Sequence, residues 1–326
     1  MDLSIITPDP EKLRELYVDI SLGLQNMPIV QGTVLNQIAW VRTGAEVQGG
    51  QTKYPFTWFS DKGEKLNPYE ELQAVPPEVV YLQSNMDSWG QKARIIPYEA
   101  ELADRLGILT SFLPGMLENA ADLQEQHLAD LLGDGENKDD VYDGLKWLAT
   151  AKRLNPNKAA LGDFQNLYAG LNLDKAGLVQ IIDSLDAARG PDGLVKTRPG
   201  QIFIICSNED QYIRASDLLM GESLATAVGA AAASQSNKGL IGRAIPVKMS
   251  KLRDYNSNKG WYGVKIVSAQ HRPVIASVRQ PPMPILEGLD PNDFVRSLRN
   301  VKKYSWRGQW SVDPGFPHLI RKAIEK

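Results

Sequence analysis

The sequence predicts a mixed α+β fold, and three stretches of the chain carry this prediction. Residues 39–82 have the alternation that is typical of extended strands. Residues 97–133 place apolar side chains at helical spacing. Residues 202–219 combine a short apolar run with a helical pattern, which indicates a strand followed by a helix. With 326 residues, 43% of them hydrophobic, the chain can bury a core in one or two domains.

The N-terminal part predicts an arm followed by a projecting hairpin. Residues 1–38 contain a short helical pattern, Pro10 to Leu24, and then no steady period, as expected for an arm that packs elsewhere. Residues 39–82 predict a long hairpin with aromatic side chains sharing one face. Such a ribbon is marginal in water unless it lies on a partner. The aromatic residues are Tyr54, Phe56 and Trp58, and the turn contains Asp61, Lys62 and Gly63.

The middle of the chain predicts a long helix. The pattern turns helical at Pro97, is interrupted at Pro114-Gly115, and resumes with an apolar stripe that ends at Gly133, so that one long helix with room for a kink at Pro114 is expected. An acidic loop over residues 133–140 then marks a subdomain boundary. The stripe consists of Leu117, Ala121, Leu128, Leu131 and Leu132.

The second half predicts helices and strands that alternate before a series of strands. A helix over residues 174–188 has Asp174 as its N-cap. Residues 202–206 form a strand, and Ser207 opens a helix whose Ile213, Leu218 and Leu219 are expected to face inward. Further strands are predicted at residues 243–249, 261–269, 272–284 (where prolines end the strand), and on both sides of Pro314-Gly315.

The charges are nearly balanced overall but divided along the chain. There are 36 Lys and Arg against 39 Asp and Glu, a formal charge of −3. Residues 236–326 hold 17 basic and 6 acidic side chains, which leaves 19 basic and 33 acidic in residues 1–235. In a subunit that meets its own copies, this split predicts attraction between neighbours and assembly that is sensitive to salt.

The composition excludes several classes of protein. Cys206 is the one cysteine, so no internal disulfide can form. His127, His271 and His318 lie far apart without zinc-site spacing, and we expect no metal and no cofactor. The chain begins without the basic and apolar regions of a signal peptide, and it has no apolar run of about 18 residues. We therefore expect synthesis in the cytoplasm and no membrane partner.

Active-site patterns are missing from the sequence. GxGxxG, GxxxxGK[ST] and GxSxG do not occur. Cys206 could act as a nucleophile in an α/β enzyme if folding brought His271 close, but a small buried hydrophobe is the favoured interpretation. For the carboxylates Asp139 and Asp140, a solvated loop is favoured. The basic stretch 302–307 could bind nucleic acid, although an outward strand face is favoured. The sequence therefore points to an assembly protein.

The order of these parts resembles the major capsid protein of tailed bacteriophages, with the Hong Kong ninety-seven-type fold that encapsulin shells also use. Within that group the chain looks most like the major head subunit of Mu-like phages, the gpT family. The resemblance covers nearly the whole chain. The passages that carry it are YDGLKWL, LDAARGPDGLVKTRPGQIFIICSNEDQYIRASDLL, RPVIASVRQPPMP and YSWRGQWSVDPGFPHLIRKAI.

The resemblance implies a structural protein rather than an enzyme. It implies self-assembly into hexamers and pentamers of an icosahedral shell around double-stranded DNA, in a virion whose proteins are made in the host cytoplasm. Scaffolding, portal and decoration proteins would be further partners. Tyr54, Phe56, Trp58 and the tip Asp61, Lys62 and Gly63 would lie at subunit interfaces. An encapsulin compartment is the close alternative, and an α/β enzyme or a DNA-binding module is more distant.

The resemblance also implies a division of the chain into five parts. The extended hairpin would lie across a neighbouring subunit, and the axial domain would meet its copies at the centre of each capsomer. The parts are the N-terminal arm 1–38, the extended hairpin 39–82, the peripheral domain with its spine helix 83–140, the axial domain 141–289, and the closing strands of the peripheral domain 290–326.

Overall fold

The computed structural model describes most of the second half of the chain and part of the first. The predicted helix from Pro10 to Leu24, the hairpin tip Asp61-Lys62-Gly63, and Asp139 and Asp140 lie outside the described residues. For residues 51–58 and 94–97 the structure describes the backbone alone. The described residues are 33–43, 51–58, 78–90, 94–97, 108–138, 141, 143–154, 163–187, 200–220, 239–287 and 301–326.

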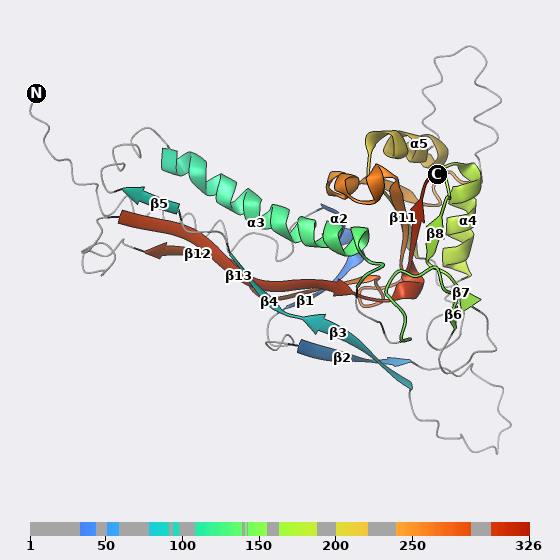
Figure 1. Cartoon of the computed structure of the whole chain (residues 1–326), viewed down its shortest axis with the longest axis horizontal. Coiled ribbons are helices and arrows are strands. Elements are labelled where there is room, and N and C mark those ends of the chain that lie inside the picture. Colours follow the sequence, from blue (N-terminus) through green and yellow to red (C-terminus); the bar gives the residue numbers. More distant parts are fainter. Residues whose placement is uncertain are drawn as a thin grey trace, which may run out of the picture.

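Two five-stranded sheets and one long helix organise the molecule, which confirms the mixed α+β prediction. The long sheet has the order β1-β12-β13-β4, with β5 also paired to β13. Helix α3 runs along this sheet, and the hairpin β2–β3 lies on the other side of it (Figure 1). The helices and strands of this part of the molecule are α2 (Thr33–Ile38), β1 (Ala39–Thr43), β2 (Gln51–Trp58), β3 (Glu78–Asn85), β4 (Asp87–Gly90), β5 (Arg94–Pro97), α3 (Ile108–Gly133), β12 (Val274–Glu287) and β13 (Val301–Pro314).

The second sheet, here called the compact sheet, has the order β10-β9-β11-β14-β8 and lies beyond one end of α3 (Figure 1). Helices α4 and α5 pack against it. None of the described helices combines the length and apolar character needed to cross a bilayer. The elements are β6 (Arg153–Leu154), β7 (Asp163–Phe164), β8 (Leu167–Ala169), α4 (Lys175–Asp186), β9 (Gln201–Cys206), α5 (Glu209–Met220), β10 (Ile245–Lys248), β11 (Gly260–Ile266) and β14 (Ile320–Ile324).

Strand β12 continues past its prolines, contrary to the sequence prediction, whereas α3 is one long helix across Pro114, as the sequence predicts. Helix α3 begins at Ile108, and Pro114 lies beyond its first turn, where the missing amide hydrogen removes one hydrogen bond of the helix. Strand β12 continues to Glu287 with register shifts between Val278 and Met283. Beyond Val278, β12 no longer pairs with β1, so the proline nitrogens need not donate on that edge.

The caps and inner faces of the two compact-sheet helices are largely as predicted. The Asp174 side chain accepts a hydrogen bond from the Gly177 amide at 2.8 Å, which confirms it as the α4 N-cap. Helix α5 is capped by Asn208 rather than Ser207, because the Gln211 amide donates to Asn208 Oδ1 at 2.8 Å. Ile213 is 47% exposed, so its predicted inward position is wrong, whereas Leu219 is buried.

The chain crosses between the two sheets at Gly315. This residue follows β13 and precedes a 3₁₀ turn and β14. A Cβ atom at Gly315 would lie 2.7 Å from the carbonyl carbon and oxygen of Pro273 and 2.8 Å from the Arg272 oxygen. These are backbone atoms that are themselves hydrogen-bonded to the crossing segment. Only glycine therefore allows this close approach.

Gly315→Ala is expected to lower the free energy of unfolding by about 2–3 kcal/mol, because the added methyl group must displace backbone. Urea unfolding followed by circular dichroism measures the loss. Gly239→Ala is the matched control, since a Cβ atom at Gly239 would meet nothing within 4 Å. The control should change stability by less than about 0.5 kcal/mol. Equal effects of the two substitutions would contradict the crossing argument.

Candidate assembly surfaces and the joint between the sheets

The hairpin β2–β3 confirms the predicted ribbon at the level of the backbone. Its strands pair antiparallel from Gln51 opposite Asn85 to Trp58 opposite Glu78. Positions 54, 56 and 58 therefore lie opposite Leu82, Val80 and Glu78, on the same face of the ribbon. This ribbon forms a two-stranded sheet of its own among the described residues. It has the exposed edges of an element that needs a partner.

A few contacts attach the root of the hairpin to the body. Leu82 is 3% exposed and packs in a small cluster with Ile275, Phe316 and Leu319. Two residues further on, Ser84 is also buried, and it belongs to a polar cluster that we call the serine cluster. The intervening side chains of β3, on its other face, are exposed. The serine cluster consists of Ser84, Ser277, Ser311 and Asp313.

An open cleft of about 540 Å³ lies beside this root. It is bounded by β3, β4, the end of α3 and the end of β13. Its wall is both aromatic and acidic, and it includes Tyr81, which is 58% exposed. Such a wall favours contact with another molecule. Other lining residues are Asp87, Trp89, His127, Asp130, Lys138 and Asp313.

His127 lies in the wall of the cleft. Its ring centroid is 4.0 Å from that of Trp89, and Trp310 Nε1 donates to its Nδ1 at 3.2 Å. Burial lowers the pKa of His127, against the opposing charges of Asp130 and Asp87. A neutral ring with an accepting Nδ1 thus fastens α3 to β4 and β13.

The carbonyl end of α3 is capped by side chains from the compact sheet. Tyr262 donates to the Leu132 oxygen at 3.0 Å, and Lys322 Nζ donates to the Gly133 oxygen at 2.9 Å. Lys322 also lies 2.5 Å from Glu136 Oε1. Its side chain is fully buried, and burial lowers its pKa while Glu136 opposes that shift. A cation here complements the negative end of the helix dipole.

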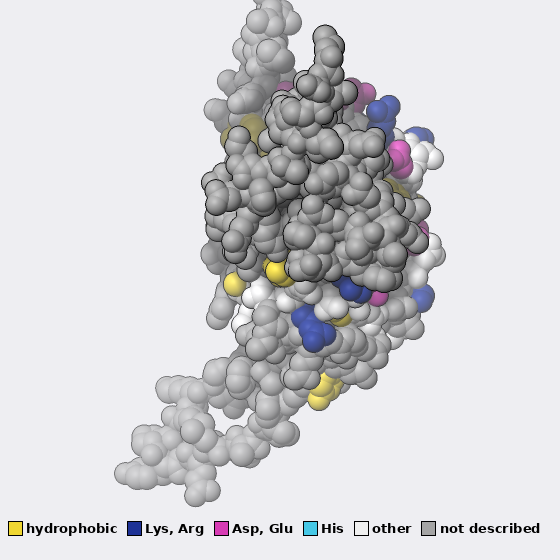
Figure 2. Space-filling view, turned by 90° about the vertical axis from the view of Figure 1, so that its left-hand side faces the viewer, with side chains coloured by type: hydrophobic (Ala, Val, Ile, Leu, Met, Phe, Trp, Pro, Cys, Tyr) yellow, Lys and Arg dark blue, Asp and Glu magenta, His cyan; other side chains and the backbone are white. Residues whose placement is uncertain are grey.

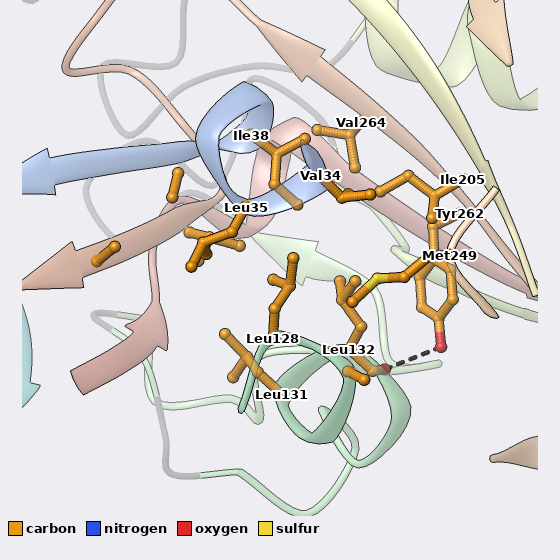
Figure 3. Packing of buried hydrophobic residues seen from close by; sticks show 14 of the residues in the cluster. Val34, Leu35, Ile38, Leu128, Leu131, Leu132, Ile205, Met249, Tyr262 and Val264 are labelled. Carbon is orange, nitrogen blue, oxygen red and sulfur yellow. Dashed lines mark hydrogen bonds between the residues drawn. The ribbon is translucent and has the colours of Figure 1, made fainter. Parts of the chain in front are cut away.

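A continuous apolar core surrounds this cap. Figure 3 shows side chains from α2, from the last turns of α3 and from the compact sheet pointing toward one another. Because one core serves both sheets, it fixes the angle between the helix and the compact sheet. We call this region the joint. Its central residues are Val34, Leu35, Ile38, Leu128, Leu131, Leu132, Ile205, Met249, Tyr262 and Val264.

Exposed apolar side chains gather where α5 meets β10. Met220 and Ile241 are each 45% exposed, and Ile245 is 37% exposed. They lie near one another because the Gly242 amide donates to the Leu219 oxygen at 2.9 Å, and α5 packs against β10. This group, which we call the α5 patch, is a second candidate contact surface.

Many charges of the acidic and basic parts of the chain pair within the subunit. Four ion pairs join a lysine of residues 236–326 to an acidic residue of residues 1–235. On the end view in Figure 2, the visible described side chains are separate basic, acidic and hydrophobic groups rather than one charged patch. The pairs are Lys248 with Glu209, Lys251 with Asp122, Lys265 with Asp186, and Lys322 with Glu136.

The structure does not support Cys206 as a nucleophile. Cys206 is fully buried between α4, α5 and the compact sheet, and burial raises the pKa of its thiol to about 12. His271 is engaged elsewhere, with Ser268 at 2.9 Å and the ring of Phe316. In the described part of the chain, no group of three or more His, Cys, Asp or Glu residues could hold a metal ion.

Cys206 is expected to resist a thiol reagent in the native protein at neutral pH, because its sulfur is both buried and protonated. Absorbance of the released aromatic thiolate measures the reaction. The same protein in guanidinium chloride should react fully and serves as the control. Rapid labelling without denaturant would contradict this prediction and would revive the enzyme hypothesis.

Comparison with known proteins gives structural matches only. No family model and no curated protein matches the sequence. Among solved structures, the capsid of cyanophage P-SCSP1u matches with a TM-score of 0.59 and 9% identity, over 92% of this chain and 90% of that chain. The chain has the fold of a phage capsid protein. The predicted capsid fold is therefore confirmed.

Two further capsid structures agree with this fold. The cyanophage Pam1 capsid matches with a TM-score of 0.54 and 12% identity, over 92% of this chain and 93% of that chain. The procapsid of bacteriophage JBD30 matches with a TM-score of 0.53 and 15% identity, over 98% of this chain and 77% of that chain. The capsid fold thus covers the hairpin, α3 and both sheets rather than one module.

Proposed function

We propose that this chain is the major capsid subunit of a tailed phage, and that it assembles with its own copies into an icosahedral shell around double-stranded DNA. The observation that carries this proposal is a capsid fold that extends over 92% of the chain. The passages quoted from the sequence favour the Mu-like gpT family within this fold. The subunit would act in the virion capsid after synthesis in the host cytoplasm.

Each candidate surface has a role in this proposal. The ribbon β2–β3 lies across a neighbouring subunit, where Tyr54, Phe56 and Trp58 gain the burial that an isolated hairpin lacks. The tip Asp61-Lys62-Gly63 would contact the same neighbouring subunit. The α5 patch meets its copies around the capsomer centre. Many such contacts add across a closed shell, so each one can be weak.

We retain the five-part division as part of the proposal. Residues 290–326 connect both bodies, because β13 belongs to the long sheet and β14 to the compact sheet. Scaffolding, portal and decoration proteins would be additional partners, and the enclosed DNA would be contacted without sequence specificity. The similar structures are phage capsids, which favours a viral head over an encapsulin compartment.

Electron microscopy of the expressed full chain tests the proposal, alone and with neighbouring phage genes co-expressed. The expected result is closed shells or ring-shaped capsomers that sediment rapidly. A protein that stays monomeric at high concentration under all these conditions would refute it. Shells that load a cargo protein through a short peptide, rather than DNA, would favour the encapsulin alternative.

A further inference from the structure

The serine cluster joins three segments that are distant in sequence. Ser84 Oγ of β3 lies 2.7 Å from Oδ2 of Asp313, 2.8 Å from Oγ of Ser311 and 3.1 Å from Oγ of Ser277. Ser277 belongs to β12, whereas Ser311 and Asp313 belong to β13. The three serines are at most 5% exposed. The root of the hairpin is therefore held to the long sheet by a buried polar contact.

The hydrogen bonds of this cluster depend on the charge of Asp313. A serine hydroxyl has one hydrogen, so Ser84 cannot donate to both Asp313 and Ser277 at the same time. An ionised Asp313 only accepts, whereas a neutral Asp313 supplies a further donor. Protonation therefore offers a donor to the serine oxygens and removes a charge from a partly buried site without changing the shape of the side chain.

The surroundings of Asp313 disfavour its charge. Burial raises the pKa of Asp313, and the negative charge of Asp87 acts in the same direction. Hydrogen bonds from Ser311, Ser84 and the Asn85 backbone oppose the shift without cancelling it. Other titratable groups line the same cleft. They are Asp87 of β4, His127 and Asp130 of α3, Lys138 after α3 and Tyr81 of β3. On the neighbouring strand β1, Arg42 lies opposite Ser277 of the cluster in the register of β1 with β12.

Leu82 and the serine cluster hold the inner face of β3 to the body. On the inner face of β3, Leu82 is the neighbouring contact, and the outer face opens onto the cleft. Asp313 lies at the edge of the cleft, so a shift of the hairpin would expose the rest of the cluster to water from that side. If the hairpin root separates from the long sheet, Asp313 becomes solvated and its pKa returns toward its ordinary value. The attached state thus binds the proton more tightly than the detached state.

We propose that the serine cluster is a protonation-dependent latch: neutral Asp313 holds the hairpin on the long sheet, and ionised Asp313 loosens it. The sign follows from linkage, since attachment is strongest below the ordinary pKa and weakens as the pH rises through the raised one. The latch acts within one subunit, so it does not depend on the proposed shell.

Hydrogen exchange of the full chain, corrected for intrinsic exchange rates, tests the latch over a series from about pH 4 to about pH 8. In the wild type, protection of the β2–β3 amides should fall several-fold as the pH rises, while the amides of β9 and β11 change little. In Asp313→Asn, protection should stay high and independent of pH. Asp87→Asn is the control and should retain most of the wild-type dependence.

A second variant keeps the test decisive if Asp313→Asn does not fold. Ser311→Ala removes a donor that favours the ionised carboxylate, so the midpoint of the loss of protection should move to higher pH. A wild-type profile that is flat, a midpoint that Ser311→Ala leaves unmoved, or an Asp313→Asn variant that keeps the wild-type dependence would each overturn the latch.

Discussion

Replacing residues 55–81 by an Asn-Gly dipeptide is expected to abolish shell formation while the subunit still folds. Tyr54 and Leu82 lie directly opposite each other in β2 and β3, so a two-residue turn can close the shortened ribbon. Leu82 and Ser84 keep their contacts with the body. The shortened chain loses the ribbon that would lie across a neighbour. Electron microscopy should show no closed shells, and circular dichroism should show a native spectrum.

A matched variant separates the ribbon from its tip. Replacing only residues 59–77 by a Gly/Ser linker of equal length keeps both strands and their register. If the strand face carries the contact, this variant assembles, whereas the shortened chain does not. If the tip Asp61-Lys62-Gly63 carries it, both fail. Normal shells from the shortened chain would contradict the role of the hairpin altogether.

Local patterns predict the elements whose structure depends on local forces. The apolar run at residues 202–206 forms β9, and Asp174 caps α4, because a short apolar run and an N-cap are both set by neighbouring residues. The prolines of β12 were expected to end their strand. They do not, because β12 is not paired with β1 beyond Val278, and this pairing depends on a segment that is far away in the sequence.

The candidate surfaces could be predicted only in part. The alternation of aromatic and other residues over 51–58 predicts the ribbon, because this pattern lies within a single strand. The serine cluster has no such signal, since Ser84 is 193 residues from Ser277 and 229 residues from Asp313. A serine at an inward position of a strand, such as Ser84, is only a weak indication of a buried polar cluster. Lys322 at the joint is equally hidden, because its carbonyl acceptor is 189 residues away.

The charge split along the sequence has a different meaning in the folded subunit. Lysines of the basic part already pair with acidic residues of the other part, as Lys265 does with Asp186 at 2.7 Å. Within one subunit, these pairs neutralise charges that the sequence analysis expected to attract neighbouring copies. Most of them are partly exposed, so each contributes little to stability. Any salt sensitivity of assembly therefore has to come from charges outside these pairs.

Leu132→Ala at the joint is expected to lower the free energy of unfolding by about 2–5 kcal/mol, because a fully buried side chain leaves a cavity that both sheets must close around. Leu123→Ala, at a partly buried position of the same helix, is the matched control and should cost less than half as much. Urea unfolding measures both. Equal losses would mean that the joint is no tighter than the rest of α3, and that the angle between α3 and the compact sheet is set elsewhere. A larger loss at Leu132 would instead support a single core that fixes α3 relative to the compact sheet.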